Sequence, residues 1–270
     1  MAGAACTSTA TGATSNLAQD FETIGSLIRR SANELIRVPG AAIPGVLAPT
    51  IFFLGLTSVF GSLTLLPGFD TNTYASFMIP VSMLQGAGFT GAAAGVNLAR
   101  DIEFGLFDRF LASPAPRWVL LAGLVASAAI RALIPATFVF LIAIAVGAHF
   151  PGPLGLIVTF AMVMGMAVLA SCWAAMVALK FKTQSASPLM QTVILAAVLC
   201  TTAYAPQALL TGWLATVAEY NPITQVVDAT RQGFIGGVTW SGTWPGIVVL
   251  IALTAILGAL ALRGMRRTAY

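Results

Sequence analysis

The chain has 270 residues, of which 58% are hydrophobic and only 8% are charged, whereas an ordinary soluble domain is about 25% charged. This composition excludes a soluble globular protein and indicates an integral membrane protein, because several apolar runs reach the roughly 20 residues needed to cross a bilayer. The runs show no alternation, which favours an all-α protein over a barrel. The net charge of +4 comes from basic residues that flank the runs without forming a patch, so nucleic acid is not an expected partner.

The first 40 residues divide into two segments. Residues 1–16 are small and uncharged, which predicts a disordered tail that lacks the basic start and apolar core of a signal peptide. Residues 17–40 carry apolar side chains at helical spacing, with Arg29, Arg30 and Glu34 among the polar residues between them. The pattern predicts a cytoplasmic amphipathic helix that lies in the membrane interface. An ordinary soluble helix before the membrane is the alternative interpretation.

Six apolar runs predict a transmembrane domain of six helices over residues 41–265. The predicted spans cover about 41–66, 73–98, 118–148, 154–179, 188–205 and 244–262. In the second span, Gly91 and Gly95 belong to a small-residue face that would let another helix approach closely, and a dimer contact is one use of such a face. Arg131 lies near the middle of the third run. It is either a structural cation that snorkels or pairs at the inner leaflet, or a residue on a substrate path.

The segment between the second and third spans is charged, so it must lie outside the bilayer. Apolar residues spaced four apart predict a short helix over about 101–112 with one apolar stripe and one charged face. Asp101 and Glu103 would lie at its N-terminus, where negative charge is favoured, and Ser113-Pro114 would end it. A charged helix outside the membrane offers a surface that a partner can bind.

Residues 206–236 are too polar to span the membrane, yet their apolar residues recur at helical spacing. Asn221-Pro222 is a strong helix start, with Asn as the cap and Pro at the first helical position. The pattern predicts two short helices that dip into the outer leaflet and carry Arg231 on the outer side.

Counting basic residues gives the orientation. If both termini are cytoplasmic, 11 of the 13 basic residues lie on the inner side, with Arg231 outside and Arg131 within a span. So strong a bias predicts a multi-pass plasma-membrane protein with both termini inside. The inner residues are Arg29, Arg30, Arg37, Arg100, Arg109, Arg117, Lys180, Lys182, Arg263, Arg266 and Arg267.

The sequence lacks the motifs of an enzyme. It contains no serine nucleophile motif, no zinc-binding motif, only one histidine and no phosphate-binding loop, so we expect no catalysis, no metal and no ATP binding by this chain alone. The predicted spans hold no carboxylate. Any active transport must therefore draw its energy from elsewhere.

Several motif residues resemble the permease subunits of ABC-2 type exporters, and within them the daunorubicin-resistance (DrrB-like) permeases. The similar motifs are Tyr74-x-x-Phe77-x-x-Pro80, Asp101-x-Glu103-x-Gly105-x-x-Asp108-Arg109 and, in the outer hairpin, Asn221-Pro222 with Arg231. The similarity covers about residues 20–265. It implies a fold like the ABCG exporters (type V exporters), with an N-terminal interfacial helix, a cytoplasmic coupling helix and extracellular re-entrant helices.

The resemblance also implies partners and site residues. Two permeases, copies or paralogues, would pair in a bacterial plasma membrane in contact with lipid, above two separate ATPase subunits that bind ATP and Mg. The coupling helix that contacts each ATPase would carry Asp101, Glu103, Gly105, Asp108 and Arg109. Arg29, Arg30 and Glu34 would lie on the interfacial connecting helix, and Asn221, Pro222 and Arg231 on the re-entrant hairpin.

The expected function is export of a hydrophobic or amphipathic small molecule, drug-like or lipid-like. Apart from Arg131, the predicted bundle lining offers apolar groups and uncharged polar residues, of which Gln85, Thr90 and Asn97 are the expected path residues. The alternatives are a non-translocating assembly or sensing subunit of an ATPase complex, or a permease for a polar substrate such as an ion or a polysaccharide.

Overall fold

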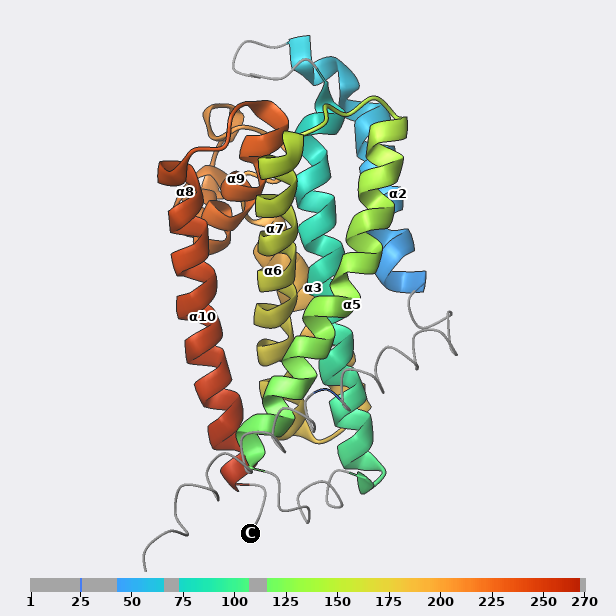
Figure 1. Cartoon of the computed structure of the whole chain (residues 1–270), viewed down its shortest axis with the longest axis vertical. Coiled ribbons are helices and arrows are strands. Elements are labelled where there is room, and N and C mark those ends of the chain that lie inside the picture. The colour runs from blue at the N-terminus through green and yellow to red at the C-terminus, as the bar shows by residue number, and fades with distance from the viewer. Residues whose placement is uncertain (1–24, 26–42, 66–72, 107–115, 268–270) are drawn as a thin grey trace, which may run out of the picture.

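The computed structural model describes residues 25, 43–65, 73–106 and 116–267, and these ranges form helices and connecting turns with no strand. The long helices run side by side, and α8 and α9 gather at one end, beside the start of α10 (Figure 1). The predicted tail (1–16), most of the predicted interfacial helix (17–40) and residues 107–115 lie outside the described ranges. In chain order the α-helices are α2 (Ile43–Phe60), α3 (Tyr74–Glu103), α5 (Arg117–Ala145), α6 (Gly152–Phe181), α7 (Ser187–Leu199), α8 (Trp213–Tyr220), α9 (Pro222–Ile235) and α10 (Trp240–Arg267).

α3 is the central helix, because α2, α5, α6, α7 and α9 all pack against it. Most of its length is buried, including polar residues such as Ser82 and Gln85. Its many small residues let neighbouring backbones approach closely. A Cβ at Gly91 would collide with the carbonyl oxygen of Ala167, and one at Gly95 would collide with Ala174, both on α6. The helix that uses the predicted small-residue face is therefore α6 of the same chain.

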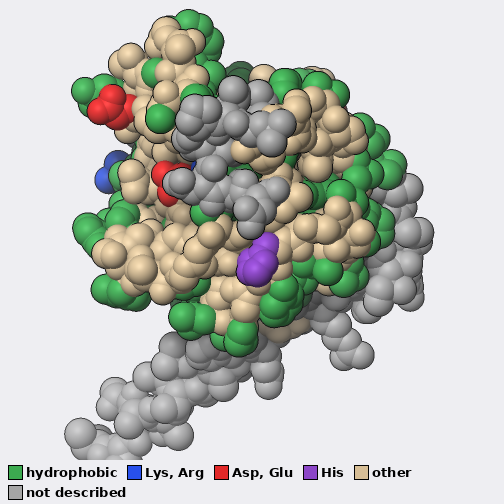
Figure 2. Space-filling model, turned by 90° about the horizontal axis from the view of Figure 1, so that it is seen from above, with side chains coloured by type: hydrophobic (Ala, Val, Ile, Leu, Met, Phe, Trp, Pro, Cys, Tyr) green, Lys and Arg blue, Asp and Glu red, His purple; other side chains and the backbone are tan. Residues whose placement is uncertain are grey.

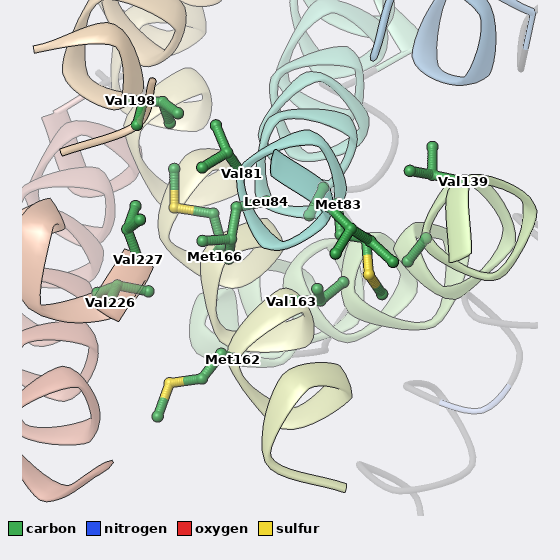
Figure 3. Packing of buried hydrophobic residues seen from close by; sticks show 14 of the residues in the cluster. Val81, Met83, Leu84, Val139, Met162, Val163, Met166, Val198, Val226 and Val227 are labelled. Carbon is green, nitrogen blue, oxygen red and sulfur yellow. The ribbon is translucent and has the colours of Figure 1, made fainter. Parts of the chain in front are cut away.

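The core extends from the middle of the bundle to α9. Figure 3 shows Val81 and Leu84 of α3 facing Met166 of α6, with Val226 and Val227 of α9 close by. All five of these side chains are fully buried, with 0% exposure. α9 is thus part of the packed core and not a loosely attached surface helix.

Within the described ranges, α5, α6 and α10 are each long and apolar enough to cross a membrane. α3 is as long as α6 but is not among them, because its sequence includes four glycines and polar residues such as Ser76, Ser82 and Gln85. A helix enclosed by five others need not be uniformly apolar, since its polar groups do not face lipid. The six predicted spans each contain a described helix. Crossing by all six stays a prediction.

Two predicted spans differ from the structure in helical extent. The α-helix of the first ends at Phe60 and continues as a short 3₁₀ helix, Gly61–Leu65. The fifth was predicted to reach residue 205, but α7 ends at Leu199, so its 13 residues extend only about 20 Å, less than the roughly 30 Å of hydrocarbon. Residues 200–205, here called the unwound segment, follow without helical structure.

Candidate functional site

The structure places two polar regions at opposite ends of the bundle (Figure 1). The α3 end contains the last turn of α3, the start of α5 and the last turns of α6 and α10. The α9 end contains α8, α9, the unwound segment and the start of α3. Most residues that sequence reasoning selected lie at one of these two ends.

At the α3 end, the predicted start of a separate helix at residue 101 is wrong. Asp101 and Glu103 lie on the last turn of α3, and the N–H of Phe104 still donates to the carbonyl oxygen of Arg100 at 3.0 Å. Gly105 follows with φ +70°, a left-handed conformation in which glycine commonly ends a helix. Of the apolar residues that suggested this helix, Ile102 lies on α3 and Leu106 follows the turn, while Phe107, Phe110 and Leu111 lie outside the described residues.

The turn after α3 exposes apolar side chains beside charged ones. Phe104 is 65% exposed and Leu106 is 40% exposed, and the guanidinium of Arg100 lies 5.9 Å from the ring centre of Phe104. Exposed aromatic and arginine side chains are common anchors of protein interfaces. Asp108 and Arg109, the other predicted coupling residues, lie outside the described ranges, as do Arg29, Arg30 and Glu34 of the predicted interfacial helix.

Glu103 makes a contact that the sequence did not suggest. Its Oε2 accepts a hydrogen bond from the backbone N–H of Gln184 at 2.9 Å. Gln184 begins the 3₁₀ helix Gln184–Ala186, which leads directly into α7. The chain reaches this point from α6 through Lys182, which has φ 55°. Glu103 therefore joins the end of α3 to the start of α7.

Apart from Arg131 on α5 and Arg231 on α9, the described basic residues lie at the α3 end. They lie at the helix termini that meet there, and Arg117 of α5 donates from Nη1 to the carbonyl oxygen of Met265 on α10 at 3.3 Å. By contrast, Figure 2 shows the α9 end with His149 among mostly apolar and uncharged side chains. The described basic residues at the α3 end are Arg100, Arg117, Lys180, Lys182, Arg263, Arg266 and Arg267.

At the α9 end, Asn221 performs two roles. Its Oδ1 accepts from the N–H of Ile223 at 3.0 Å, which caps α9 as the Asn-Pro start predicts. Its Nδ2 donates to the carbonyl oxygens of Ala197 and Cys200, each at 2.8 Å. These carbonyls belong to the last turn of α7, where no further helical N–H follows. Asn221 thus stabilises the end of α7 as well as the start of α9.

Arg231 was predicted to lie in the outer hairpin, and the structure places it on α9, where its side chain is only 6% exposed. Its Nη2 donates to the carbonyl oxygen of Thr202 at 2.7 Å and, at 3.4 Å, to that of Ala203. Its Nη1 lies 3.3 Å from the carboxylate of Asp228, and its guanidinium lies 3.8 Å from the ring centre of Phe77. The unwound segment offers backbone carbonyls that need a donor, and the Arg231 guanidinium supplies it.

Burial is the main cause of the pKa shifts of the two charged residues at this site. Burial lowers the pKa of Arg231 to about 10, with Asp228 acting in the opposite direction, so Arg231 stays cationic near neutral pH. Burial raises the pKa of Asp228, while Arg231 and a hydrogen bond from Thr202 lower it. A charge taken out of water is costly unless it is paired and hydrogen-bonded, and here both conditions are met.

Sequence reasoning missed most members of this Arg231 cluster, which comprises Arg231, Asp228, Thr202, Phe77 and Tyr74. Tyr74 donates from its hydroxyl to the carbonyl oxygen of Tyr204 at 3.0 Å, which fastens the unwound segment to the start of α3. Tyr74 and Phe77 belong to a family motif, but the motif gave them no role. The three-residue spacing of Asp228 and Arg231 could have suggested a pair on one helix face.

The predicted path residues do not form one surface. Gln85 is 3% exposed, and its Nε2 has no hydrogen-bond partner. Thr90 donates to the carbonyl oxygen of Gly86 at 2.9 Å. Asn97 is half-buried further along α3, and Arg131 is half-buried on α5. Among the described residues, no three metal-ligating side chains lie together.

Comparison with known proteins gives a family match and several relatives. A model of the ABC-2 type transporter family matches residues 22–235. The chain is 26% identical over 206 residues to the probable multidrug ABC transporter permease YbhR of Escherichia coli, covering 72% of this chain and 53% of that protein. The chain therefore spans about half the length of that relative.

The alignment with this chain covers a larger share of two further relatives. The daunorubicin resistance ABC transporter permease protein DrrB1 of Streptomyces coeruleorubidus is 26% identical over 232 residues, which is 83% of this chain and 79% of DrrB1. The probable doxorubicin resistance ABC transporter permease protein DrrC of Mycobacterium tuberculosis is 26% identical over 257 residues, which is 90% of this chain and 88% of DrrC.

Proposed function

Because the chain belongs to the ABC-2 type transporter family, we propose that it is the permease subunit of an ATP-driven exporter. ATP and Mg bind to two separate ATPase subunits, a second permease completes the pathway, and this chain supplies no catalytic group. The observation that carries the proposal is the family match together with an exposed, charged and apolar turn at the end of the central helix.

The turn after α3 is the proposed ATPase contact. Arg100, Asp101 and Phe104 place charge and an aromatic ring at the end of α3 and the turn that follows it. A rigid helix behind this tip is packed on five others, so a push at the turn acts on the whole bundle. Asp108 and Arg109 would extend the same contact.

The α3 end is proposed to face the cytoplasm, which puts both chain termini on that side. The basic residues at the ends of α3, α5, α6 and α10 support this orientation, since lysine and arginine concentrate on the cytoplasmic side of membrane proteins. The α9 end, with α8 and α9 as the re-entrant hairpin, then faces outward. We propose all six predicted helices as spans, with α7 and the unwound segment together forming the fifth.

The proposed substrate is a hydrophobic or amphipathic small molecule. The names of the relatives include a multidrug transporter permease and permeases of daunorubicin and doxorubicin resistance, and the described helices present mainly apolar side chains. Gln85, whose buried amide nitrogen is unpaired, is the residue we would place on the path when the bundle opens. Thr90, Asn97 and Arg131 are the other proposed path residues.

The test is reconstitution with the cognate ATPase. We expect the ATPase to copurify with this chain, and ATP to drive daunorubicin into inverted vesicles, followed by its fluorescence. An ATPase that copurifies and hydrolyses ATP while no tested drug or lipid moves would favour the non-translocating sensing subunit. Failure of any ATPase to associate would refute the proposal.

A matched pair of variants tests the contact itself. Arg100→Glu reverses a charge beside Phe104 at the proposed interface, and we expect it to reduce ATPase copurification. Arg263→Glu reverses an exposed charge at the end of α10, away from the turn, and should leave copurification at the wild-type level. Equal loss in both variants would show a general charge effect and no specific contact at the turn.

A further inference from the structure

α7 is attached to the bundle along one narrow stripe. Met190, Ile194 and Val198, spaced four residues apart, are buried, while most residues on its other faces are at least partly exposed. Ile194 lies over Gly88 of α3, where a β-carbon would come within 2.5 Å of its Cγ2 atom. Because so little of α7 is enclosed, its position depends strongly on how its two ends are fastened.

The first fastening is Glu103. The carboxylate at the end of α3 accepts the N–H of Gln184, and the 3₁₀ helix that begins there runs into α7 without a break. A negative charge at this point is also favoured by the helix dipole. A displacement of the turn after α3 must therefore either move the start of α7 or break this bond.

The second fastening is at the α9 end. Asn221 holds the carbonyls of Ala197 and Cys200, and Arg231 holds those of Thr202 and Ala203. The end of α7 and the unwound segment are thus tied to α9 by these four hydrogen bonds and by two more at the Thr202 hydroxyl, which accepts from Arg231 and donates to Asp228. Since α9 packs in the core, movement of α7 along its axis would be transmitted to α9.

We propose that Glu103 is a positioning residue for transport, which links the turn after α3 to α7, and that α7 carries displacement from that turn to the unwound segment. The inference rests on the proposed function, because it assumes that an ATPase acts at the turn. It assigns the Glu103 carboxylate to a contact within this chain, so that its neighbours and not Glu103 itself bind the ATPase.

Three variants distinguish a positioning role of Glu103 from a role in binding the ATPase. Glu103→Ala removes the acceptor. Glu103→Gln removes the charge but keeps an acceptor oxygen. Gln184→Pro removes the donor N–H, and the extended backbone of Thr183, with φ −142° and ψ 147°, suits the residue before a proline. A proline is also compatible with the first position of a 3₁₀ helix, where φ is about −60°.

Cys200 is a native reporter at the far end of α7. It is half-buried and carries a free thiol, whereas Cys172 is buried. In the reconstituted permease–ATPase complex, N-ethylmaleimide alkylation of Cys200 is measured with and without ATP, and mass spectrometry identifies the labelled cysteine. This readout needs no knowledge of the substrate.

In wild type and Glu103→Gln we expect ATP to change the alkylation rate of Cys200. In Glu103→Ala and Gln184→Pro that change should be lost, although the ATPase copurifies in undiminished amount. An ATP-dependent change that persists in both of these variants would overturn the inference. So would loss of ATPase copurification in Glu103→Gln, since that result would make Glu103 a docking residue.

The proposed function can fail separately. If no ATPase associates with wild type, the proposed function is refuted and this inference falls with it. If wild type transports but ATP leaves Cys200 alkylation unchanged, the permease function stands and the role of α7 is refuted.

Discussion

The two ends of the bundle hold their polar groups in opposite ways. At the α9 end, Arg231 is 6% exposed and is bonded to backbone carbonyls, a carboxylate and an aromatic face. At the α3 end, Glu103 is exposed and accepts a hydrogen bond from the backbone N–H of Gln184, which lies 81 positions later in the chain. A buried charge is costly to unpair, whereas an exposed one can exchange its partner for water at little cost.

This difference indicates which end can be reshaped. The α9 end should move as a unit, because opening it would leave a guanidinium and several carbonyls without partners in an apolar surrounding. The α3 end can change its contacts when a partner binds, since water or a partner's side chain can replace each bond. Under the proposed function, the α3 end would receive force from the ATPase and the α9 end would keep its shape.

The largest expected effect is at Arg231. Arg231→Leu leaves the carbonyl of Thr202 without its donor and the carboxylate of Asp228 without its cation, and we expect a loss of about 3 kcal/mol in stability. The measurement is the thermal midpoint of the purified permease in detergent. Arg231→Lys, which keeps the charge but not the forked geometry, should lose less. A midpoint unchanged by Arg231→Leu would mean that the α9 end is as easily reshaped as the α3 end.

The next effect is at Gly91, in the helix body that separates the two ends. Gly91→Val would force α3 away from α6, because a β-carbon there collides with the backbone at Ala167, and we expect a cost of about 2 kcal/mol. Gly55→Val on α2 is the control, since no atom lies within 4 Å of its β-carbon position. Equal thermal midpoints for the two variants would show that α3 and α6 are not in rigid contact.

A smaller effect is expected at Asn221. Asn221→Ala removes the cap of α9 and both donors to the end of α7, which should cost about 1.5 kcal/mol. Asn221→Asp keeps the capping oxygen and loses only the donors, so it should fall between alanine and wild type. Thermal midpoints measured for all three proteins check this order. If aspartate were no better than alanine, the cap of α9 would contribute nothing.

The smallest effect is at the α3 end. Gly105→Ala places a β-carbon on a residue with φ +70°, which should cost about 1 kcal/mol, although nothing lies within 4 Å of that position. Gly237→Ala has equally open surroundings without the left-handed backbone, so it isolates the conformational cost. To compare the two variants, the amount of ATPase that copurifies with each is measured over a series of urea concentrations. A larger loss at Gly105 than at Arg231 would reverse the comparison between the ends.

Much of the candidate site follows from the sequence, but its contacts do not. The start of α9 was visible in Asn221-Pro222, because capping is a local interaction between residues two positions apart. The second role of Asn221, as a donor to the end of α7, was not visible, since its Nδ2 donates to carbonyls more than 20 positions earlier in the chain. Glu103 was selected for its charge, yet its partner lies 81 positions away.

The sequence by itself determined that the chain is helical, belongs in a membrane and carries its charge in a few places, because crossing hydrocarbon demands long apolar runs and confines charge to their ends. Only the tertiary structure decided that α3 is enclosed, that α7 stops at Leu199 and that Arg231 is buried. The physical reason is hydrogen bonding. A backbone carbonyl away from water needs a donor, and when a distant side chain supplies it, the local pattern of the sequence no longer decides where a helix ends.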